Sequence, residues 1–301
     1  MSNIAIIGAG PGGLAAGLIL LNQGHQVTIY EKDHLVGGRS KRLTFGPYHF
    51  DSGPTFFMYQ PILREVFERA NIDFDKYLQL TPLDPLYTLY FNEYTLKPSS
   101  DINQTKEVFE SVYPGAGNDY VKWYQKQTTK FKRVMPILQK PFPNIFHFLR
   151  ADVLKGAPVL HPFQSVYKYL SKLIHHDDLI HTLSFQAKYL GMASFEAPSV
   201  FTILPYLEHM GGLYHVEGGL NQVNETMAQL FIKNGGKLHL NTKVDRLWIE
   251  KRTVKGIITD QLHQSYDDVI LNADFAYSML SMTKDKEVKT YHHQKIKSMK
   301  Y

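Results

Sequence analysis

Apolar residues near the N-terminus follow a strand pattern, then a helix pattern, then a strand pattern again. Residues 3–8 (NIAIIG) form a short apolar run, and residues 26–30 (QVTIY) form a second run rich in β-branched side chains. Between them, the leucines of residues 11–22 recur at helical spacing, and Gly24 follows as a C-cap. The pattern predicts a β-α-β unit at the very start of the chain.

A similar alternation of helix and strand returns near the other end of the sequence. Apolar positions at helical spacing run from Leu220 to Leu230, and Gly235-Gly236 ends this predicted helix. The same spacing predicts a helix over residues 61–71. Residues 76–210 instead show a mixed, aromatic-rich pattern with frequent prolines, which predicts an inserted region made mainly of helices. Further strands are predicted over residues 237–241, 243–250, 254–259 and 268–271.

Composition narrows the class of protein. The 301 residues are 44% hydrophobic and 20% charged, close to the average of soluble globular proteins, which excludes a disordered, collagen-like or multi-span membrane protein. The chain holds no cysteine, which excludes disulfides, cysteine–metal sites and a thiol nucleophile. Because no basic region precedes the first apolar run, we expect no secretory signal and a cytoplasmic location.

Residues 121–176 form a strongly basic segment. They include ten Lys or Arg residues against a single acid, Asp152, a net charge of +9 in a chain whose net charge is +5. Nine aromatic residues are interleaved with these cations. Such a pattern suits an anionic membrane surface and also nucleic acid. The alternative is a solvated helix face whose aromatic side chains point inward.

The first predicted turn carries the glycine pattern G-x-G-x-x-G at Gly8, Gly10 and Gly13. It follows a predicted strand and opens a predicted helix, the setting in which the pattern marks a dinucleotide-binding site rather than a structural turn. Gly8 makes the tight turn, Gly10 lets the backbone approach a diphosphate, and Gly13 packs the helix close to the strand. The helix N-terminus favours the diphosphate. Glu31 ends the second strand, where it can accept hydrogen bonds from a ribose.

Two further patterns separate FAD from NAD, which the glycine pattern alone does not distinguish. Gly37-Gly38-Arg39 follows Glu31 closely, and residues 50–55 (FDSGPT) come next. A second glycine pair allows another close backbone approach to the cofactor, and Arg39 can neutralise a phosphate region. Simple NAD-binding folds have no need of these features, so the sequence favours FAD.

With these motifs, the chain resembles the FAD-dependent amine-oxidase-type flavoproteins, and among them the bacterial carotenoid desaturases of the phytoene desaturase type. Residues 185–205 are similar to the dehydrosqualene (diapophytoene) desaturases and the diapolycopene oxygenases. The similarity runs across essentially the whole chain. The motifs that carry it are Gly8 to Gly13, Glu31, residues 37–39, residues 51–55, residues 214–220 (YHVEGGL) and residues 269–274 (VILNAD).

The resemblance implies an α/β fold of the amine-oxidase superfamily. A Rossmann-like FAD-binding domain would be discontinuous over residues 1–75 and 211–283, with an α+β substrate domain inserted at residues 76–210. Residues 284–301 would begin a further substrate-domain segment. Because the family is longer, we expect such a protein to continue beyond Tyr301.

The resemblance also implies which residues hold the cofactor. The first glycine loop would hold the diphosphate, the second loop would lie along the dinucleotide, and Gly53 to Thr55 would approach the flavin. The predicted cofactor-binding residues are Gly8, Ala9, Gly10, Gly12, Gly13, Glu31, Lys32, Gly37, Gly38, Arg39, Gly53, Pro54, Thr55 and Val244. The alternative for Val244 is a core strand position. Residues 272–274 either line the nucleotide or form a strand-end turn.

The resemblance finally implies an FAD-dependent desaturase of a long isoprenoid hydrocarbon, such as dehydrosqualene or phytoene, in carotenoid biosynthesis. Such a substrate needs an apolar tunnel and resides in the bilayer, which favours a peripheral membrane role for residues 121–176 over nucleic acid. No catalytic acid–base group stands out, and no histidine pair has metal-ligand spacing, so we expect no metal site. The alternatives are a polyene oxygenase, an amine oxidase, and a non-enzymatic prenyl-binding protein of the same fold.

Overall fold

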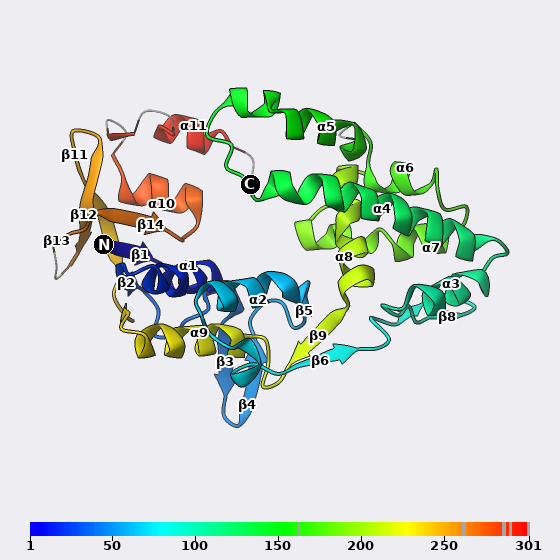
Figure 1. Ribbon diagram of the computed structural model, residues 1–301, viewed down its shortest axis with the longest axis horizontal. Coiled ribbons are helices and arrows are strands. Elements are labelled where there is room, and N and C mark those ends of the chain that lie inside the picture. The colour runs from blue at the N-terminus through cyan, green and yellow to red at the C-terminus, as the bar shows by residue number, and fades with distance from the viewer. Residues whose placement is uncertain (162, 261–262, 285–286, 289–290, 300–301) are drawn as a thin grey trace. The chain divides into compact units, whose positions relative to one another are not determined.

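A computed structural model describes residues 1–161, 163–260, 263–284, 287–288 and 291–299 (Figure 1). The chain forms two compact units, one of residues 1–81 with 215–301 and one of residues 82–214. The sequence placed the boundaries at residues 75/76 and 210/211. It also set residues 284–301 apart, whereas the structure groups them with the first unit. Of that segment, residues 285–286, 289–290 and 300–301 lie outside the described residues.

The first unit alternates strands and helices. The chain leaves it within β6 and returns within β9. Its elements are β1 (Asn3–Ile7), α1 (Pro11–Asn22), β2 (Gln26–Tyr30), η1 (Gly38–Ser40), β3 (Arg42–Phe45), β4 (Tyr48–Asp51), β5 (Phe57–Met58), α2 (Gln60–Arg69), η2 (Phe74–Lys76), β6 (Leu80–Leu83), β9 (Leu213–Val216), α9 (Asn221–Lys233), β10 (Lys237–His239), β11 (Val244–Glu250), β12 (Thr253–Thr259), β13 (His263–Ser265), β14 (Asp268–Leu271), α10 (Phe275–Met282) and α11 (His293–Lys297).

Four parallel strands form the central sheet of this unit, in the order β10-β2-β1-β14. Helix α1 joins β1 to β2, so the predicted β-α-β unit is confirmed. The predicted strand 237–241 ends at His239, because Asn241 takes a left-handed conformation with φ 52°. Since all four strands run the same way, their carboxyl ends share one edge of the sheet.

Both faces of this sheet are covered, as parallel sheets require. Ile6 and Ile29 face the core formed with helices α1, α2 and α9. Ala5 and Ile7 face the opposite core, formed with the antiparallel sheet β11-β12-β13. The alternation of side chains along β1 therefore divides one short strand between two hydrophobic cores.

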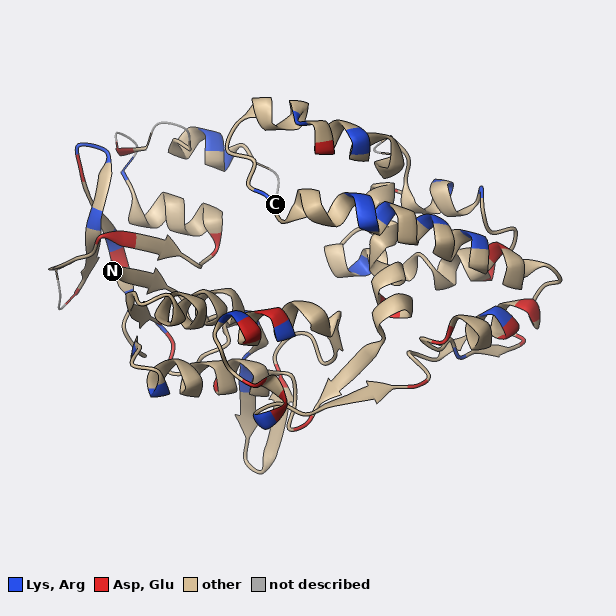
Figure 2. Ribbon diagram, in the orientation of Figure 1, with Lys and Arg blue, Asp and Glu red and all other residues tan. Residues whose placement is uncertain are grey.

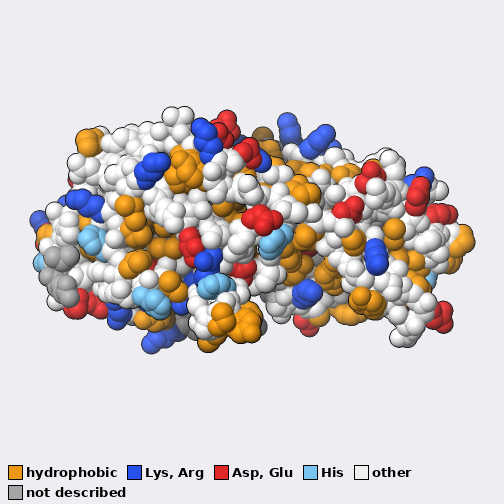
Figure 3. Space-filling view, turned by 90° about the horizontal axis from the view of Figure 1, so that it is seen from below, with side chains coloured by type: hydrophobic (Ala, Val, Ile, Leu, Met, Phe, Trp, Pro, Cys, Tyr) orange, Lys and Arg blue, Asp and Glu red, His pale blue; other side chains and the backbone are white. Residues whose placement is uncertain are grey.

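The β3–β4 hairpin presents apolar side chains to solvent. Phe45, Tyr48 and Phe50 are each more than half exposed, and the rings of Phe45 and Phe50 meet edge to face with centroids 6.2 Å apart. The hairpin extends downward in Figure 1, and the view from below shows apolar side chains gathered at that position (Figure 3). The hairpin thus adds an exposed apolar surface to the first unit.

The second unit is mainly helical, with one short hairpin, as the sequence predicted. Its core contains Trp123 and Tyr169, so part of the aromatic content of the basic segment packs inward. No described helix is long and apolar enough to cross a bilayer. The elements are β7 (Leu89–Tyr90), β8 (Thr95–Leu96), α3 (Ile102–Glu110), α4 (Ala116–Leu138), η3 (Ile145–Leu149), α5 (Ala151–Leu160), α6 (Val166–Leu170), α7 (Asp177–Thr182), η4 (Phe185–Leu190), η5 (Ser199–Thr202) and α8 (Ile203–Gly211).

The Phe231 ring is a sensitive point of the first core. It is fully buried, and a Cβ placed at Gly17 or Gly236 would lie 2.8 or 2.4 Å from ring atoms. We expect Phe231→Ala to lower the free energy of unfolding by about 3–5 kcal/mol, because the cavity cannot collapse. Ile232→Ala, on the exposed face of the same helix, should change it by less than about 1 kcal/mol. Equal losses in urea unfolding would contradict this role of Phe231.

Candidate functional site

The carboxyl edge of the central sheet gathers the predicted cofactor residues of the first unit. The first glycine loop follows β1, Glu31 follows β2, and Asn272 follows β14. Strand β1 lies between β2 on one side and β14 on the other. In open α/β sheets, ligands bind outside the carboxyl ends of the strands at such a switch point.

The three glycines of the first loop have different surroundings. Gly8 has φ 104°, and a Cβ there would lie 2.3 Å from the Asn272 carbonyl oxygen. A Cβ on Gly13 would lie 2.2 Å from the Gly8 carbonyl oxygen. At Gly10 the nearest atom to such a Cβ is Asn272 Nδ2 at 3.5 Å, an ordinary van der Waals distance, so a Cβ would fit there without a clash. Gly8 and Gly13 therefore serve the fold, and Gly10 leaves a cradle that a side chain would fill.

The N-terminus of α1 opens toward this cradle. Its N-cap is Gly10, which supplies no side-chain cap, and Pro11 stands in its first turn. The first backbone N–H groups of the helix therefore have no side-chain acceptor, and the helix dipole favours an anion there. Asn272 borders the same place, and its Nδ2 donates to the Gly8 carbonyl at 3.3 Å. The residues present fit a diphosphate.

Glu31 is held at the edge of the sheet by backbone groups. Its Oε2 accepts from the Ala9 N–H at 2.8 Å, and its Oε1 accepts from the Asp33 N–H at 3.0 Å. The side chain is buried, whereas the adjacent Lys32 is exposed. Each carboxylate oxygen keeps a second lone pair, so Glu31 can accept hydrogen bonds from ribose hydroxyls while it anchors the glycine loop.

The second glycine loop is attached directly to the first. The Gly37 N–H donates to the Ala9 carbonyl at 2.8 Å, and a Cβ on Gly38 would lie 3.5 Å from the Gly10 Cα. Both glycines have positive φ angles. Arg39 is 91% exposed and pairs with Asp274 at 3.3 Å. The structure thus brings the two predicted loops together at one place.

The predicted flavin-side residues Gly53, Pro54 and Thr55 lie on an exposed turn. This turn packs on the second glycine loop, because a Cβ on Gly53 would lie 2.4 Å from the Arg39 carbonyl oxygen. Ser52 Oγ donates to the same oxygen at 3.2 Å. The turn therefore continues the line of loops that begins at Gly8.

Val244 opens β11 and is buried beside Tyr30 in the core under the sheet. The preceding segment is tied to β2, because the Thr242 N–H donates to the Glu31 carbonyl at 2.8 Å. Val244 is thus a core strand residue held close to Glu31. Both interpretations offered by the sequence remain compatible with this placement, since its contact with adenine would be made by backbone atoms.

Asp51 has a role that sequence reasoning missed. Its carboxylate accepts from the Leu220 and Asn221 N–H groups at 2.9 Å each, at the start of α9. Partial burial alone would raise the pKa of Asp51, but these hydrogen bonds, the Asn221 side chain and nearby Arg42 together lower it. The signal was available in the sequence: Gly218-Gly219-Leu220 offers no N-cap side chain of its own, so the cap must come from elsewhere.

Three other contacts join the same segments. Arg42 Nε donates to Asn221 Oδ1 at 2.9 Å and its Nη2 donates to the Gly218 carbonyl at 3.2 Å. Asn224 Nδ2 donates to the Ser40 carbonyl at 3.0 Å. The motif at residues 214–220 therefore supports the second glycine loop from behind.

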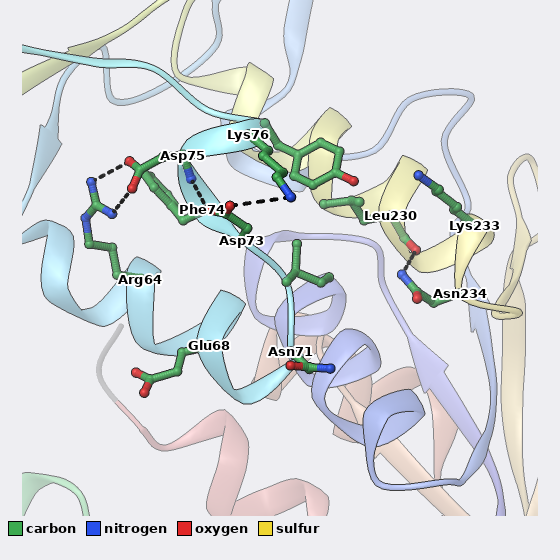
Figure 4. Close-up of a pocket in the computed structure, with 12 residues that line it drawn as sticks. Arg64, Glu68, Asn71, Asp73, Phe74, Asp75, Lys76, Leu230, Lys233 and Asn234 are labelled. Atoms are coloured by element: carbon green, nitrogen blue, oxygen red, sulfur yellow. Dashed lines mark hydrogen bonds and ion pairs between the residues drawn. The ribbon is translucent and has the colours of Figure 1, made fainter.

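A cavity of about 730 Å³ in the same unit lies at the other end of α9, where Leu230, Lys233 and Asn234 line it (Figure 4). Four of its charged groups pair with one another: Arg64 Nη2 binds Asp75 at 2.9 Å, and Lys76 Nζ binds Asp73 at 3.7 Å. Asp51 and the glycine loops meet the N-terminal end of α9, about 20 Å away along the helix. This cavity is therefore separate from the carboxyl-edge site.

The second unit contains a buried polar cluster that the sequence did not reveal. Glu208 accepts from Gln186 Nε2 at 2.7 Å and from the Tyr189 hydroxyl at 3.1 Å, and burial raises its pKa to about 7. Next to it, burial lowers the pKa of His209 to about 3, and its two ring nitrogens contact the Tyr87 and Tyr120 hydroxyls. Gln186 and Tyr189, which lie in the segment that carried part of the resemblance, thus hold Glu208 in a buried hydrogen-bond network in this unit.

Comparison with known families decides the class of the protein. Residues 11–301 match the family described as flavin containing amine oxidoreductase. The chain belongs to this family. A flavin as the cofactor class is thereby confirmed, as is the predicted α/β fold of the amine-oxidase superfamily.

Individual relatives agree with this assignment. The chain is 35% identical over 300 residues to a 4,4'-diapophytoene desaturase (4,4'-diapolycopene-forming) of Methylomonas sp, covering 99% of this chain and 59% of that protein. It is 28% identical over 288 residues to an all-trans-zeta-carotene desaturase of Myxococcus xanthus, covering 93% and 54%. The chain thus spans less than two thirds of the length of these curated relatives. The predicted resemblance to carotenoid desaturases is confirmed.

Solved structures show the same fold at low identity. An oxidoreductase from Methanosarcina mazei superposes with a TM-score of 0.64 at 21% identity, covering 93% of this chain and 61% of that one. A putrescine oxidase variant gives 0.62 at 16% identity, covering 98% and 63%. Which residues of this chain touch the flavin stays a prediction.

The Asp51 cap leads to a pH-dependent prediction. We expect Asp51→Ala to lower the free energy of unfolding by about 1–2 kcal/mol at pH 7, because α9 loses a charged cap. The folded-state pKa of Asp51 lies below its unfolded value. Its contribution is therefore fully present above about pH 4 and is lost as pH falls through the lower folded-state pKa.

Urea unfolding at several pH values measures this effect. Wild type and Asp51→Ala should differ at pH 7 and converge in acid. Asp75→Ala is a matched control. The pKa of this exposed carboxyl is also lowered, chiefly by the Arg64 hydrogen bond, but Asp75 does not cap α9. A stability difference between wild type and Asp51→Ala that did not change with pH would contradict the cap.

Proposed function

We propose that the protein is an FAD-dependent oxidoreductase that desaturates a long isoprenoid hydrocarbon in carotenoid biosynthesis. The observation that carries the proposal is the cradle at Gly10, at the switch point of the parallel sheet, with Glu31 fixed beside it. The relatives' names support the substrate class, since they are desaturases of 4,4'-diapophytoene and zeta-carotene.

The residues of the carboxyl edge would divide the cofactor between them. The α1 N-terminus and Gly10 would bind the diphosphate, and Glu31 would accept from the adenosine ribose. Gly37 to Arg39 and Gly53 to Thr55 would follow the dinucleotide toward its isoalloxazine end. When bound, the flavin supplies the hydride acceptor, so that two hydrogens leave adjacent carbons of the substrate as a hydride and a proton.

The chain's own residues would bind and orient rather than exchange protons. Asn224 holds the segment of the second glycine loop against α9 through the Ser40 carbonyl, and Asp51 and Arg42 join the strands that follow it to the start of the same helix. A hydrocarbon substrate offers no group for an ion pair, so its site must exclude water with apolar side chains. This division of roles agrees with the lack of an acid–base constellation in the sequence.

Gly10→Val tests the cofactor site. We expect this variant to bind FAD at least tenfold more weakly, a change of about 1.4 kcal/mol, because its branched side chain fills the diphosphate cradle. Gly10 has φ −74°, so a side chain causes no backbone strain, and the cofactor-free protein should unfold at an unchanged temperature. Stoichiometric yellow flavin in purified Gly10→Val would overturn the assignment of this loop.

The activity is tested by supplying dehydrosqualene and phytoene separately to cells that make the full-length protein. Each new double bond lengthens the conjugated system, so pigment absorbing at longer wavelength should form with wild type and not with Gly10→Val. The preferred chain length would follow from which substrate gives pigment. Unchanged substrate in both cultures would contradict desaturase activity, and oxygenated products would favour the polyene oxygenase.

A peripheral membrane role for the basic segment forms the second part of the proposal. Ile145, Phe146 and Phe148 are exposed on η3, in a stretch that also exposes Leu149. Lys132 and Arg133 are exposed on α4. The sequence expected Lys130 to serve the same surface, but its side chain is buried. Apolar insertion from η3, with cations nearby in the sequence, supports reversible docking on an anionic bilayer.

Vesicle co-sedimentation separates the two contributions. Each Lys or Arg near such a surface contributes about 1 kcal/mol, so Lys132→Gln with Arg133→Gln should weaken binding to anionic vesicles at low salt. This loss should fade as salt rises. Ile145→Ser with Phe146→Ser should weaken binding at every salt concentration. Equal binding of wild type and both double variants would show that neither group meets a membrane.

A further inference from the structure

The second unit contains a cavity of about 580 Å³ between α4 and the chain around residues 159–173. Lys122, Lys126 and Lys130 lie four residues apart on α4, so they share one face of the helix and all line the cavity. Lys172 lines the facing wall. Figure 2 shows that Lys and Arg residues recur along α4.

The lining contains four lysines and no Asp or Glu residue. Lys122 is partly neutralised by Asp119 at 3.5 Å, an aspartate that also contacts His175 at 2.6 Å. Lys172 Nζ donates to Gln164 Oε1 at 3.2 Å, a neutral partner. Within the described part of the chain, no ion pair engages the ammonium of Lys126 or Lys172. The cavity therefore holds uncompensated positive charge.

Lys130 is one of the lining residues and is only 2% exposed. Its Nζ donates to Thr202 Oγ1 at 3.0 Å and to the Ser199 carbonyl at 3.3 Å, and it lies 4.4 Å from the Tyr169 ring centroid. Burial lowers its pKa to about 8. A buried ammonium without a carboxylate partner is unfavourable, and an anion in the cavity would compensate it.

We propose that this cavity binds a multiply charged phosphate group, a phosphomonoester or a diphosphate. Four lysines in the lining of one cavity match two or more negative charges, and lysine binds phosphate as a compact point charge. Thr129, Gln125 and Gln164 add neutral hydrogen-bonding groups to the lining. The cavity also exceeds the size of phosphate alone, and Val159 and Leu173 give it apolar wall, so the phosphate would belong to a larger organic molecule.

This site goes beyond the proposed desaturase activity. The proposed substrate is a hydrocarbon without charge, so it makes no use of four lysines. A phosphate-bearing ligand could be a free metabolite or the headgroup of an anionic lipid. Both sources present the same chemistry to the cavity, and they can be separated because only one of them holds the protein on a bilayer.

The experiment measures binding of inorganic pyrophosphate by calorimetry at low salt, and of vesicles with and without phosphatidic acid by co-sedimentation. The test variant is Lys126→Gln with Lys172→Gln, two exposed lysines that line the cavity. The matched control is Lys97→Gln with Lys168→Gln, two exposed lysines of the same unit that are not among the lining residues. Both variants remove the same charge.

We expect the test variant to bind pyrophosphate at least tenfold more weakly and the control to bind it within about twofold of wild type. If phosphatidic acid vesicles are also lost selectively by the test variant, and pyrophosphate competes for them, the source is a lipid headgroup. Selective loss of pyrophosphate alone identifies a soluble ligand. Equal losses in the two variants would show that binding depends on the net charge of the protein and not on this cavity, which would contradict the proposal. If the wild type bound neither probe, the proposal would be overturned. Neither readout involves flavin or hydrocarbon, so a failure here is distinct from failure of the proposed activity.

Discussion

The close approach of β14 to the first glycine loop is the constraint on which the rest of the candidate site depends. A Cβ on Gly8 would lie 2.3 Å from the Asn272 carbonyl oxygen, and one on Gly13 would lie 2.2 Å from the Gly8 carbonyl oxygen. No side chain can be accommodated at either place without moving backbone. Because the backbone segments meet here, the start of α1 lies against the end of β14, and Gly10 lies beside Asn272.

The second glycine loop depends on segments far away in the sequence. It is bound in front by the Ala9 carbonyl and behind by α9, through Asn224 and Arg42. Asp51 caps the same helix. The two motifs that the sequence shows about 170 residues apart are therefore one structural element. Such an arrangement makes the loop geometry independent of the ligand, which is the usual requirement for precise cofactor placement.

The basic segment of the second unit divides into groups with different roles. Trp123 and Tyr169 belong to the core, Lys130 lines a cavity, and the η3 side chains face solvent. The side chains of this segment therefore lie in three different environments, which its net charge does not distinguish: the core, the lining of a cavity and the solvent-exposed surface. The same unit keeps Glu208 and His209 adjacent and buried, and burial shifts each pKa toward the neutral form. Hydrogen bonds to Gln186, Tyr189, Tyr87 and Tyr120 let this interior carry these polar groups beside an apolar core.

The sequence by itself determined the β-α-β unit, the glycine loop and the family. Alternating and helical apolar spacing specify local structure, and Gly8 and Gly13 mark places where backbone atoms leave no room for a Cβ. It did not reveal the cap by Asp51, the burial of Lys130, or the network at Glu208. Those features depend on which distant segments pack together. The sequence does not distinguish a carboxylate or an ammonium that faces water from one that lies at a helix end. Only the tertiary structure supplied the partners, and with them the burial and hydrogen bonds that decide what each charge does.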